Sequence, residues 1–527
     1  MKKPLVISLV TATLLSTNVY AQSMYEKFEA MQKEMQMLKQ EVATLKKEKN
    51  SEPEAQMAEK DTDEEEAISI EEEDDDLEET LEFFDSKISQ LNKATSGNRL
   101  KFGADYRFSL DNIKYKMADK SKAENDALMT NRLWINMFWK ANNELSFRAQ
   151  VAYQKAYGAR SGASNPASSS YENFDWVTNE NAYDGNMRLK NAYFFYKNDT
   201  FASLDVPWTF SIGRRPSTNG HLINYRDNDI SSSPMAHTVN VEFDGLSSKF
   251  TLSKEWGTYV KFCAGRGLSN AAPKFSYAPY AETTDIPEID LLGLIFVPFN
   301  SGQYSLNTQY YYANNLIDSV SPTDQTLGFD TVGGMHSFTA NLLFKGIGNE
   351  WSDFLDESTF FISGAYTKTD PKDNKRMLYG ATDENGATQT GDSKTGYSYW
   401  IGAQFPSLIS KDGNWGLEFN HGSRYFRSIT YAEDTNIGSK VAARGNAYEA
   451  YFTEYLIEKY LSMQIRATYI DYKYTGSNGF FGATSGASME IDKIKAAAAA
   501  GDAASQAMLP MIVDKAQDIR LYIRYRY

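Results

Sequence analysis

Polar and apolar residues alternate along most of the chain from Leu100 onward, with a period of two residues. In residues 518–527, for example, one face carries Ile519, Leu521, Ile523, Tyr525 and Tyr527, and the other carries Asp518, Arg520, Arg524 and Arg526. Such alternation is the pattern of a strand that has one apolar and one polar face. It predicts sixteen strands, at residues 100–110, 131–140, 144–154, 187–197, 207–214, 246–254, 257–266, 287–297, 302–313, 334–345, 358–369, 396–405, 414–425, 446–456, 460–473 and 518–527.

The segment 518–527 suits the closing strand of a membrane barrel, which faces lipid on the outside and water on the inside. An edge strand of a soluble sandwich is the alternative, but five large apolar side chains on an exposed edge would favour aggregation. We therefore expect an all-β protein, a transmembrane antiparallel β-barrel of about sixteen strands. Residues 238–243 alternate weakly, and eighteen strands would result if this region joined the wall.

The connections between the predicted strands alternate between short and long. The long ones are residues 111–130, 155–186, 215–245, 267–286, 314–333, 370–395, 426–445 and 474–517. Outer-membrane barrels have short periplasmic turns and long external loops, so both barrel ends should lie on the periplasmic side of the outer membrane. In the eighth long loop, Ser488 to Ala500 predicts a helix with Ser488 as its N-cap, ending near Gly501.

Two segments precede the acidic part of the chain. Residues 1–21 have Lys2 and Lys3, then an apolar run and small residues before Gln22, which is the pattern of a secretory signal peptide. Residues 22–50 carry apolar side chains at alternating steps of four and three, which predicts a periplasmic coiled coil. A lone amphipathic helix packed on the barrel is the alternative. The seam is formed by Met24, Phe28, Met31, Met35, Leu38, Val42 and Leu45.

Residues 51–95 are expected to form an acidic linker that ends in a short helix. Its block from Glu52 to Glu82 contains 17 Asp or Glu and one Lys, a net charge of -16. The whole chain carries -15, so the remainder is almost neutral. A block of like charge repels itself and stays extended, which favours a solvated spacer over a specific cation or partner site. Residues 96–527 are then the barrel domain.

Composition agrees with a barrel. No stretch beyond the signal approaches the roughly 18 apolar residues that a membrane helix needs. With 34 Tyr and 30 Phe in an exported chain, closed strands are the structure that satisfies the backbone in lipid. Cys263 is the single cysteine, which excludes an internal disulfide.

The polar face of the strands predicts a water-filled lumen, because about sixteen strands enclose more space than their own side chains fill. Parity assigns sixteen charged residues to this face, twelve of them basic. The expected pore-lining residues are Arg107, Arg132, Arg148, Arg188, Lys190, Arg466, Arg520 and Arg524, and the others facing inward are Lys101, Asp105, Lys249, Lys261, Glu418, Glu449, Asp518 and Arg526. Rings of Arg and Lys select anions. The alternative is that these side chains pair with wall carboxylates or lipopolysaccharide.

The third long loop begins at Gly213-Arg214-Arg215-Pro216. In trimeric porins the third external loop folds into the lumen and narrows it. The same arrangement here would make a constriction from Arg214, Arg215 and Arg226 facing Asp227 and Asp229, with guanidinium groups suited to carboxylate or phosphate. An arginine pair that only caps a strand in solvent is the alternative. No metal site is expected, although Asp227 and Asp229 would suit calcium.

Three segments resemble an uncharacterised family of outer-membrane porins from Gram-negative bacteria, known as a domain of unknown function. They are Gly-Arg-Arg-Pro-Ser-Thr at 213–218, Gly-Leu-Glu-Phe-Asn-His-Gly-Ser at 416–423, and Asp-Tyr-Lys-Tyr-Thr-Gly-Ser at 471–477, followed by Gly482. The resemblance covers the barrel from end to end and implies a porin that passes small hydrophilic solutes. It implies no substrate and no binding residue.

Two other classes of function compete with the porin. His421 and Ser423 lie two residues apart and by parity face lipid, which resembles the outer-membrane phospholipases, although no Asn on a neighbouring strand is identifiable to orient the His. We expect no enzymatic activity and no cofactor. The second competitor is an envelope-tethering protein that uses the barrel as an anchor for the coiled coil.

The expected partners follow from a barrel in the outer membrane. They are membrane lipid and lipopolysaccharide, the barrel assembly machinery through the C-terminal strand, and two further copies of the chain in a homotrimer. The sequence has no basic patch that would bind nucleic acid.

Overall fold

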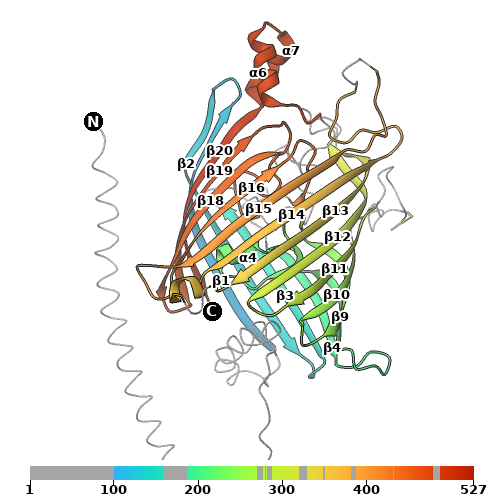
Figure 1. Ribbon diagram of the computed structural model, residues 1–527, viewed down its shortest axis with the longest axis vertical. Helices are drawn as coiled ribbons and strands as arrows, with labels where there is room; N and C mark the ends of the chain where they lie inside the picture. The colour runs from blue at the N-terminus through green and yellow to red at the C-terminus, as the bar shows by residue number, and fades with distance from the viewer. Residues whose placement is uncertain are drawn as a thin grey trace, which may run out of the picture. The chain divides into compact units, whose positions relative to one another are not determined.

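The structure is a computed structural model that describes residues 100–157, 187–269, 277–278, 281, 288–319, 329–347, 351–381, 387–430, 433–478 and 487–527. The expected signal peptide, coiled coil and acidic linker lie outside these residues. The described residues form a closed barrel with two long loops folded inside it (Figure 1).

Sixteen strands form the barrel, each hydrogen-bonded to the next along the chain, and the last pairs with the first. They are β1 (Leu100–Met117), β2 (Lys122–Lys140), β3 (Leu145–Ala156), β4 (Arg188–Asn198), β5 (Trp208–Arg215), β9 (Phe243–Ser253), β10 (Thr258–Leu268), β11 (Ile289–Asn300), β12 (Tyr304–Ser319), β13 (Phe329–Lys345), β14 (Thr359–Pro371), β15 (Thr395–Pro406), β16 (Asn414–Gly422), β18 (Gly445–Ile457), β19 (Leu461–Tyr472) and β20 (Val513–Arg526). The predicted fold and strand number are confirmed. Residues 238–243 add no wall strand, since β8 (Val239–Asn240) pairs outside the barrel sheet.

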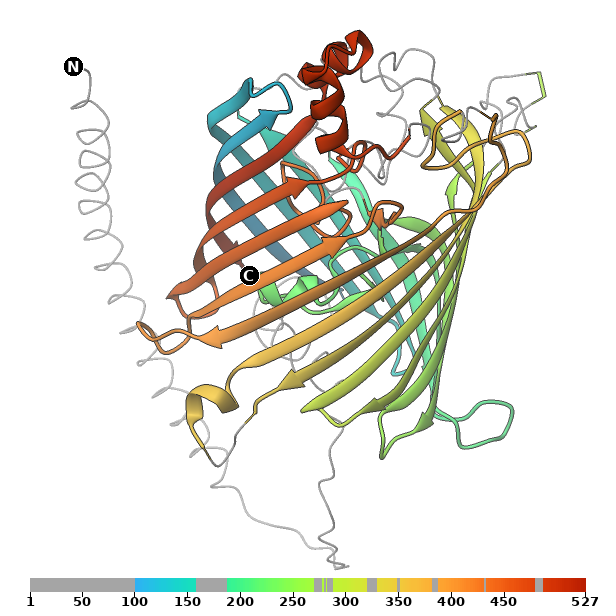
Figure 2. The same cartoon turned by 45° about the horizontal axis from the view of Figure 1, so that its top comes forward.

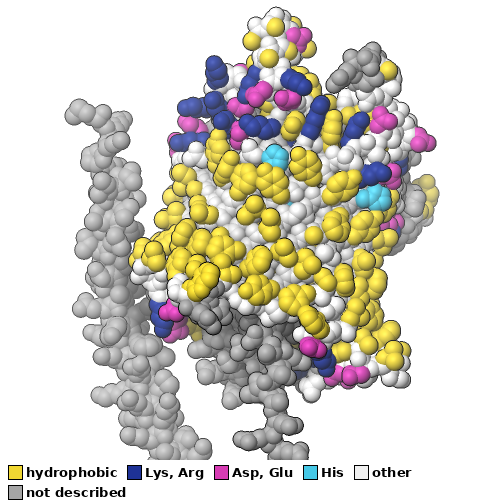
Figure 3. All heavy atoms as spheres, viewed as in Figure 1, with side chains coloured by type: hydrophobic (Ala, Val, Ile, Leu, Met, Phe, Trp, Pro, Cys, Tyr) yellow, Lys and Arg dark blue, Asp and Glu magenta, His cyan; other side chains and the backbone are white. Residues whose placement is uncertain are grey.

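Side chains alternate between the two faces of the wall as the sequence predicts. In β20, Ile519 and Leu521 are 45% and 39% exposed, whereas the intervening Arg520 is 1% exposed. The exposed face is therefore the outer face, and it is apolar and aromatic along most of each strand (Figure 3). Such a belt is the surface that a barrel presents to lipid.

The first connection differs from the expected loop at 111–130. The strands β1 and β2 continue past the membrane belt as a hairpin, and only residues 118–121 form its turn. Pairs such as Ile113 with Asn125 and Lys116 with Lys122 extend the ladder. Both faces of this hairpin are rich in polar residues, so its composition predicts a loop, although its backbone is hydrogen-bonded as a pair of strands.

The eighth long loop contains the expected helix, α6 (Ile491–Ala499), followed by α7 (Ala503–Met508) and the 3₁₀ turn η3 (Leu509–Met511). Ser488 is not its N-cap. The Ser488 hydroxyl instead donates to the Arg424 carbonyl oxygen at 2.6 Å, and Glu490 precedes the helix. A short helix, α5 (Asp353–Asp356), interrupts the turn between β13 and β14. None of the described helices has the length and apolar character required to cross a membrane.

Two connections turn into the barrel. The first, residues 216–242, contains β6 (Gly220–His221), α4 (Ile223–Asp227), β7 (Ser232–Met235) and β8. The second, residues 423–444, contains β17 (Ile429–Thr430), which pairs in parallel with β8. Figure 2 shows α4 surrounded by the strands of the wall. The two inner loops are thus joined to each other by backbone hydrogen bonds.

Apolar side chains of the inner loops pack against the wall. Val239 and Ile429 belong to a cluster with Tyr311 and other buried residues of β11–β13, and Leu222 and Ile223 pack near Trp400. These clusters show that the two inner loops occupy part of the lumen that the strand number predicts. The loops fill much of the space because the wall strands turn apolar as well as polar side chains inward.

Candidate functional site

The helix α4 places an arginine in the centre of the lumen. Arg226 is fully buried and reaches across the barrel to β18, where its Nη1 lies 3.3 Å from Glu449 Oε1. Its Nη2 donates to the Glu433 carbonyl oxygen at 2.8 Å and to Asp227 at 3.1 Å. One guanidinium therefore binds the first inner loop to the second inner loop and to the wall.

The two aspartates of the first inner loop contact β20. The Tyr522 hydroxyl donates to Asp227 at 3.1 Å, and Arg524 donates to Asp229 at 2.8 Å. Burial alone would raise the pKa of the Asp227 carboxyl, but the positive charges led by Arg226 outweigh this effect and lower that pKa below its usual range. Both carboxylates serve to hold the loop on the wall.

The second inner loop supplies a carboxylate to three wall arginines. Arg107 Nη2 donates to Asp434 Oδ1 at 2.6 Å, while Arg466 and Arg520 donate to the Asp434 carbonyl oxygen at 2.6 and 2.7 Å. Burial would raise the pKa of Asp434, yet the charges of the three arginines hold it well below its ordinary value. Asp434 therefore remains ionised and neutralises part of a dense positive cluster.

The same loop brings a lysine to two wall glutamates. Glu418 and Glu449 stand directly opposite each other on β16 and β18, where like charges disfavour strand pairing. Lys440 lies between them and donates to Glu418 at 2.6 Å and also to Glu449. All three side chains are almost completely buried. The wall and the loop are therefore electrically complementary.

A neutral histidine anchors the middle of the first inner loop. His237 is buried, and its two ring nitrogens lie 2.8 and 2.9 Å from the hydroxyls of Ser363 on β14 and Ser398 on β15. Burial lowers the pKa of His237 to about 3, so the ring stays uncharged at neutral pH. The loop is thus fixed against β14 and β15 as well as β18 and β20.

The wall from β2 to β5 with β9 and β10 is different, because several of its inward side chains keep partial exposure. Arg148 lies between the rings of Phe138 and Phe195, at 5.4 and 5.6 Å from their centres. Beside it, the amides of Asn136, Gln150 and Asn191 form a ladder of hydrogen bonds at 2.8 and 3.3 Å across three strands. This wall offers polar groups to whatever occupies the remaining lumen.

The expected constriction residues separate into two groups. Arg226, Asp227 and Asp229 lie together on the first inner loop, as described above. Arg214 is elsewhere: its Nε donates to the Leu189 and Lys190 carbonyl oxygens at 3.0 and 3.1 Å, and its partner Asp244 is largely exposed. Adjacent residues of a strand point to opposite faces, so Arg214 and Arg215 do not line the lumen together.

The expected pore-lining residues also differ in their surroundings. Arg107, Arg466, Arg520 and Arg524 are locked to carboxylates or carbonyl groups. Lys190 pairs with Glu242 at 2.8 Å, and Arg132 stacks on Trp134 at 3.5 Å, while its nearest carboxylate, Asp105, lies 3.5 Å away. Arg188 begins β4 opposite Ala152.

Sequence reasoning missed the residues of the second inner loop. Asp434, Lys440 and Glu433 lie in a segment that reads as an external loop. A signal was present in the wall, because Glu418 and Glu449 were both assigned to the inward face of neighbouring strands and therefore required a cation between them. The sequence around Lys440, which supplies this cation, has no pattern that would identify it.

The outer wall contains the histidine and serine that resemble a phospholipase. His421 Nδ1 lies 2.8 Å from Asn446 Oδ1 on β18, so the structure supplies an Asn on the neighbouring strand. Ser423 is two residues further, but its hydroxyl accepts a hydrogen bond from the Tyr397 amide at 2.8 Å. Among the described residues no hydrogen bond joins Ser423 to His421. Two of the three groups of a catalytic triad are therefore connected, and the nucleophile is not.

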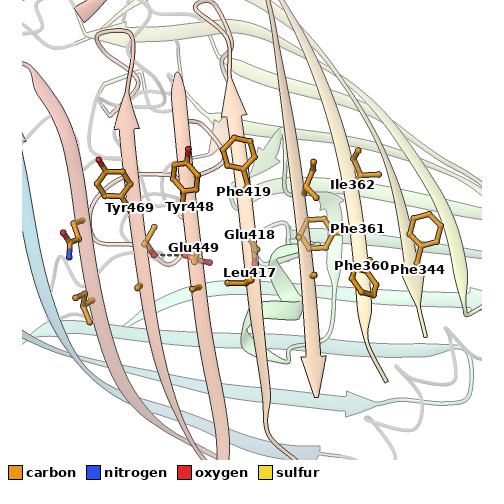
Figure 4. Close-up of a pocket in the computed structure, with 18 residues that line it drawn as sticks. Phe344, Phe360, Phe361, Ile362, Leu417, Glu418, Phe419, Tyr448, Glu449 and Tyr469 are labelled. Atoms are coloured by element: carbon orange, nitrogen blue, oxygen red, sulfur yellow. Dashed lines mark hydrogen bonds between the residues drawn. The ribbon is translucent and has the colours of Figure 1, made fainter. Parts of the chain in front are cut away.

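A shallow hollow of about 790 Å³ lies on the lipid-facing side of β13–β20. Figure 4 shows Phe419, Tyr448 and Tyr469 side by side along it. Small residues such as Ala403, Ala450 and Ala467 also line it. It is separate from the lumen, where a cavity of about 20 Å³ lies among Arg132, Asp227 and Asp434. The charged centre of the barrel is thus closely packed.

Comparison with known proteins gives one family. Residues 122–527 match DUF3373, described as a protein of unknown function. No curated protein matches the chain. Among solved structures, the chain is similar to OprB of Pseudomonas putida at high pH, with 11% identity and a TM-score of 0.43 over 84% of this chain and 96% of that one. OmpT of Vibrio cholerae is 12% identical, with a TM-score of 0.40 over 81% of this chain and 97% of that one. An anion-selective porin from Comamonas acidovorans is 9% identical, with a TM-score of 0.42 over 81% of this chain and 99% of that one.

Proposed function

The chain belongs to the DUF3373 family, and from the geometry of its lumen we propose that it is an outer-membrane channel for the passive passage of small hydrophilic solutes. The uneven filling of the lumen carries this proposal. The inner loops pack mainly on the wall from β11 through β20 to β1, with further contacts to β4 and β10, whereas inward polar side chains of β2 and β3 such as Asn136, Arg148 and Gln150 remain partly or largely exposed. A water-accessible polar strip inside a barrel suits passage.

A preference for anions is part of the proposal. The arginines of β1, β19 and β20 contribute little to it, because carboxylates of the inner loops and of β1 neutralise them. Arg148 and Arg215 stack on aromatic rings and, among the described residues, form no ion pair. Positive charge beside a narrow aqueous path with low-dielectric walls attracts anions and repels cations.

Reconstitution in planar bilayers tests the proposal. The channel should give stable conductance, and a potassium chloride gradient should produce a reversal potential of the sign that chloride permeation gives. Strong cation selectivity would contradict the preference for anions. The absence of conductance would instead favour a structural role for the barrel.

The envelope tether is the alternative from a different class. A linker of about 30 residues at roughly 3.3 Å each could place the predicted coiled coil as much as about 100 Å from the barrel. Deletion of residues 22–95 separates the two functions. A channel should still conduct after the deletion, whereas a tether should lose its attachment to the envelope.

The hydrolase alternative has one specific observation in its favour, the hydrogen bond between His421 and Asn446. In a Ser-His-Asn arrangement the Asn orients the ring so that its other nitrogen removes the hydroxyl proton. The lack of a hydrogen bond between Ser423 and His421 among the described residues weighs against it.

Homotrimer formation stays a prediction, and chemical cross-linking of the protein in intact outer membranes would test it.

A further inference from the structure

Three lysines stand side by side on the outer face of the wall. Lys116 on β1 is directly opposite Lys122 on β2 and, on its other side, directly opposite Lys515 on β20. Lys515 is four residues from the lipid-facing Ile519 on the same strand, so these three residues, the lysine row, share the outer face. Opposed residues of neighbouring strands have Cβ atoms about 4.5–5.5 Å apart, and like charges at that spacing disfavour pairing.

Carboxylates compensate only one end of the lysine row. Asp471, opposite Lys515 on β19, lies 3.9 Å from the Lys515 ammonium and 2.9 Å from the Lys473 ammonium, so two lysines already share it. Neither Lys116 nor Lys122 forms an ion pair within the described part of the chain. An anion bound between them would remove their repulsion.

The lysine row lies beyond the apolar belt, at the end of the barrel that carries α6 and the long loops. Figure 3 shows Lys and Arg side chains gathered beyond the belt at this end, with some carboxylates among them. One outward pair nearer the membrane, Lys114 stands opposite Glu124, and their charges are complementary. Lys116 is therefore the position where like charges meet on both sides.

The hollow on the lipid-facing wall begins next to the lysine row. Ala450 on β18 and Ala467 on β19 are directly opposed in its middle, between Leu417 on β16 and Ile519 on β20. Two small side chains between two larger ones leave the wall recessed there. In lipid, a recess of this kind gains van der Waals contacts when a hydrocarbon chain fills it.

The hollow and the lysine row are continuous along β20. Gln517 lines the hollow and is two residues from Lys515 on the same face. The Lys515 ammonium lies 5.9 Å from the centre of the Tyr469 ring, which also lines the hollow. The four residues from Ile519 to Lys515 span about 13 Å at 3.3 Å each. An apolar recess thus leads directly to a group of positive charges.

We propose that the lysine row and the hollow bind one lipopolysaccharide molecule of the outer leaflet, with a phosphate group on the row and an acyl chain in the hollow. A phosphate accepts charge-assisted hydrogen bonds from several ammonium groups at once. Basic clusters beside a membrane bind anionic lipid head groups in this way. The position of the row on the side of the external loops selects the lipid of the outer leaflet.

Binding of purified lipopolysaccharide to the detergent-solubilised protein, measured by microscale thermophoresis, tests the lysine row. Lys116→Gln should raise the dissociation constant about tenfold, the effect expected from loss of one charge-assisted hydrogen bond. Lys116→Arg keeps the charge and should stay within about twofold of the parent. Lys493→Gln, whose side chain is 77% exposed on α6 at the same end of the barrel, is the matched control and should change nothing.

Two further comparisons separate the phosphate from the acyl chain. Lipopolysaccharide stripped of its phosphates should bind the parent about tenfold more weakly, and Lys116→Gln should not weaken that binding further. Ala467→Phe fills the hollow and should weaken the binding of both forms. Ile465→Phe, on the same face of β19 but outside the hollow, should bind as the parent does.

Unchanged binding in Lys116→Gln would overturn the site. So would binding of inorganic phosphate that this substitution abolishes while lipopolysaccharide binding persists, because the row would then hold free phosphate. If Ala467→Phe instead dissociates an oligomer and leaves lipopolysaccharide binding as it was, the hollow belongs to a second copy of the chain, and the proposal fails there.

Discussion

Arg524 on the last strand donates its Nε to Asp105 on the first strand at 2.9 Å, across the seam where the barrel closes. Both side chains are nearly buried. The same guanidinium donates to Asp229 of the first inner loop at 2.8 Å. A single side chain therefore joins both ends of the barrel wall to the loop that narrows the lumen.

Replacing Asp105 with Asn should lower the free energy of unfolding by about 3 kcal/mol, because it removes one of the two carboxylates that neutralise the buried Arg524 and leaves only Asp229. Urea unfolding of the barrel in lipid vesicles measures this change. Asp244→Asn is the control: its side chain is 70% exposed beside Arg214, and surface ion pairs contribute at most about 1 kcal/mol. Equal losses in the two variants would contradict a special role for the seam.

Asp434→Asn should increase the single-channel conductance and the preference for anions. The substitution removes the negative charge shared by Arg107, Arg466 and Arg520, which weakens the seat of the second inner loop and exposes positive charge to the lumen. Planar-bilayer recording with a salt gradient reports both quantities. Asp412→Asn, in an exposed turn, should behave as the parent. A lower anion preference in Asp434→Asn would contradict the arrangement.

The contribution of Asp434 to the pH dependence of the current should be weak between pH 7 and 4. The pKa of Asp434 is lowered in the folded state, so its contribution is complete above the ordinary carboxyl pKa of about 3.9 and is lost only as pH falls through the lower, folded value. Recording one channel through a series of buffers checks this. A step in conductance near pH 5 or 6 would show that the second inner loop is held by a different group.

The adjacent arginines Arg214 and Arg215 should differ in single alanine variants. Arg215→Ala removes a positive charge from the lumen and should reduce the anion preference, whereas Arg214→Ala acts at the outer side of β5 and should leave it unchanged. Reversal potentials in a salt gradient distinguish the two. Equal effects would mean that both side chains reach the lumen.

His421→Ala should leave both conductance and lipid turnover unchanged, because the Ser423 hydroxyl is held by the Tyr397 amide and not by the histidine. Release of fatty acid from phospholipid vesicles is the measurement, with Asn446→Ala as the companion variant. Hydrolysis by the parent that either variant abolishes would establish the hydrolase and reverse the ranking of functions.

The wall of the barrel was predictable because strand parity is local. Each residue of β20 reveals its face through its two nearest neighbours, so Arg520 could be assigned to the lumen without knowledge of its partner. The same logic shows why Arg214 and Arg215 should not have been placed together. Gly213, with a φ of +132°, produces only a local irregularity and does not turn both side chains inward.

The inner loops were only partly predictable. The inward course of residues 216–242 came from likeness to porins, whereas that of residues 423–444 depends on contacts with partners hundreds of positions away, such as Asp434 with Arg107. A single aspartate in a polar segment has no local signature of that role. Opposed like charges on the wall, such as Glu418 and Glu449, are the feature that sequence parity can reveal and that implies a distant counter-charge.

Asp434 forms ion pairs with arginines on β1, β19 and β20. These arginines come together only when the last strand pairs with the first. The second inner loop therefore cannot form all of its contacts with the wall before the barrel is closed. Closure of the barrel and full anchoring of the second inner loop are therefore coupled, because the three arginines that hold Asp434 lie on both sides of the closing seam.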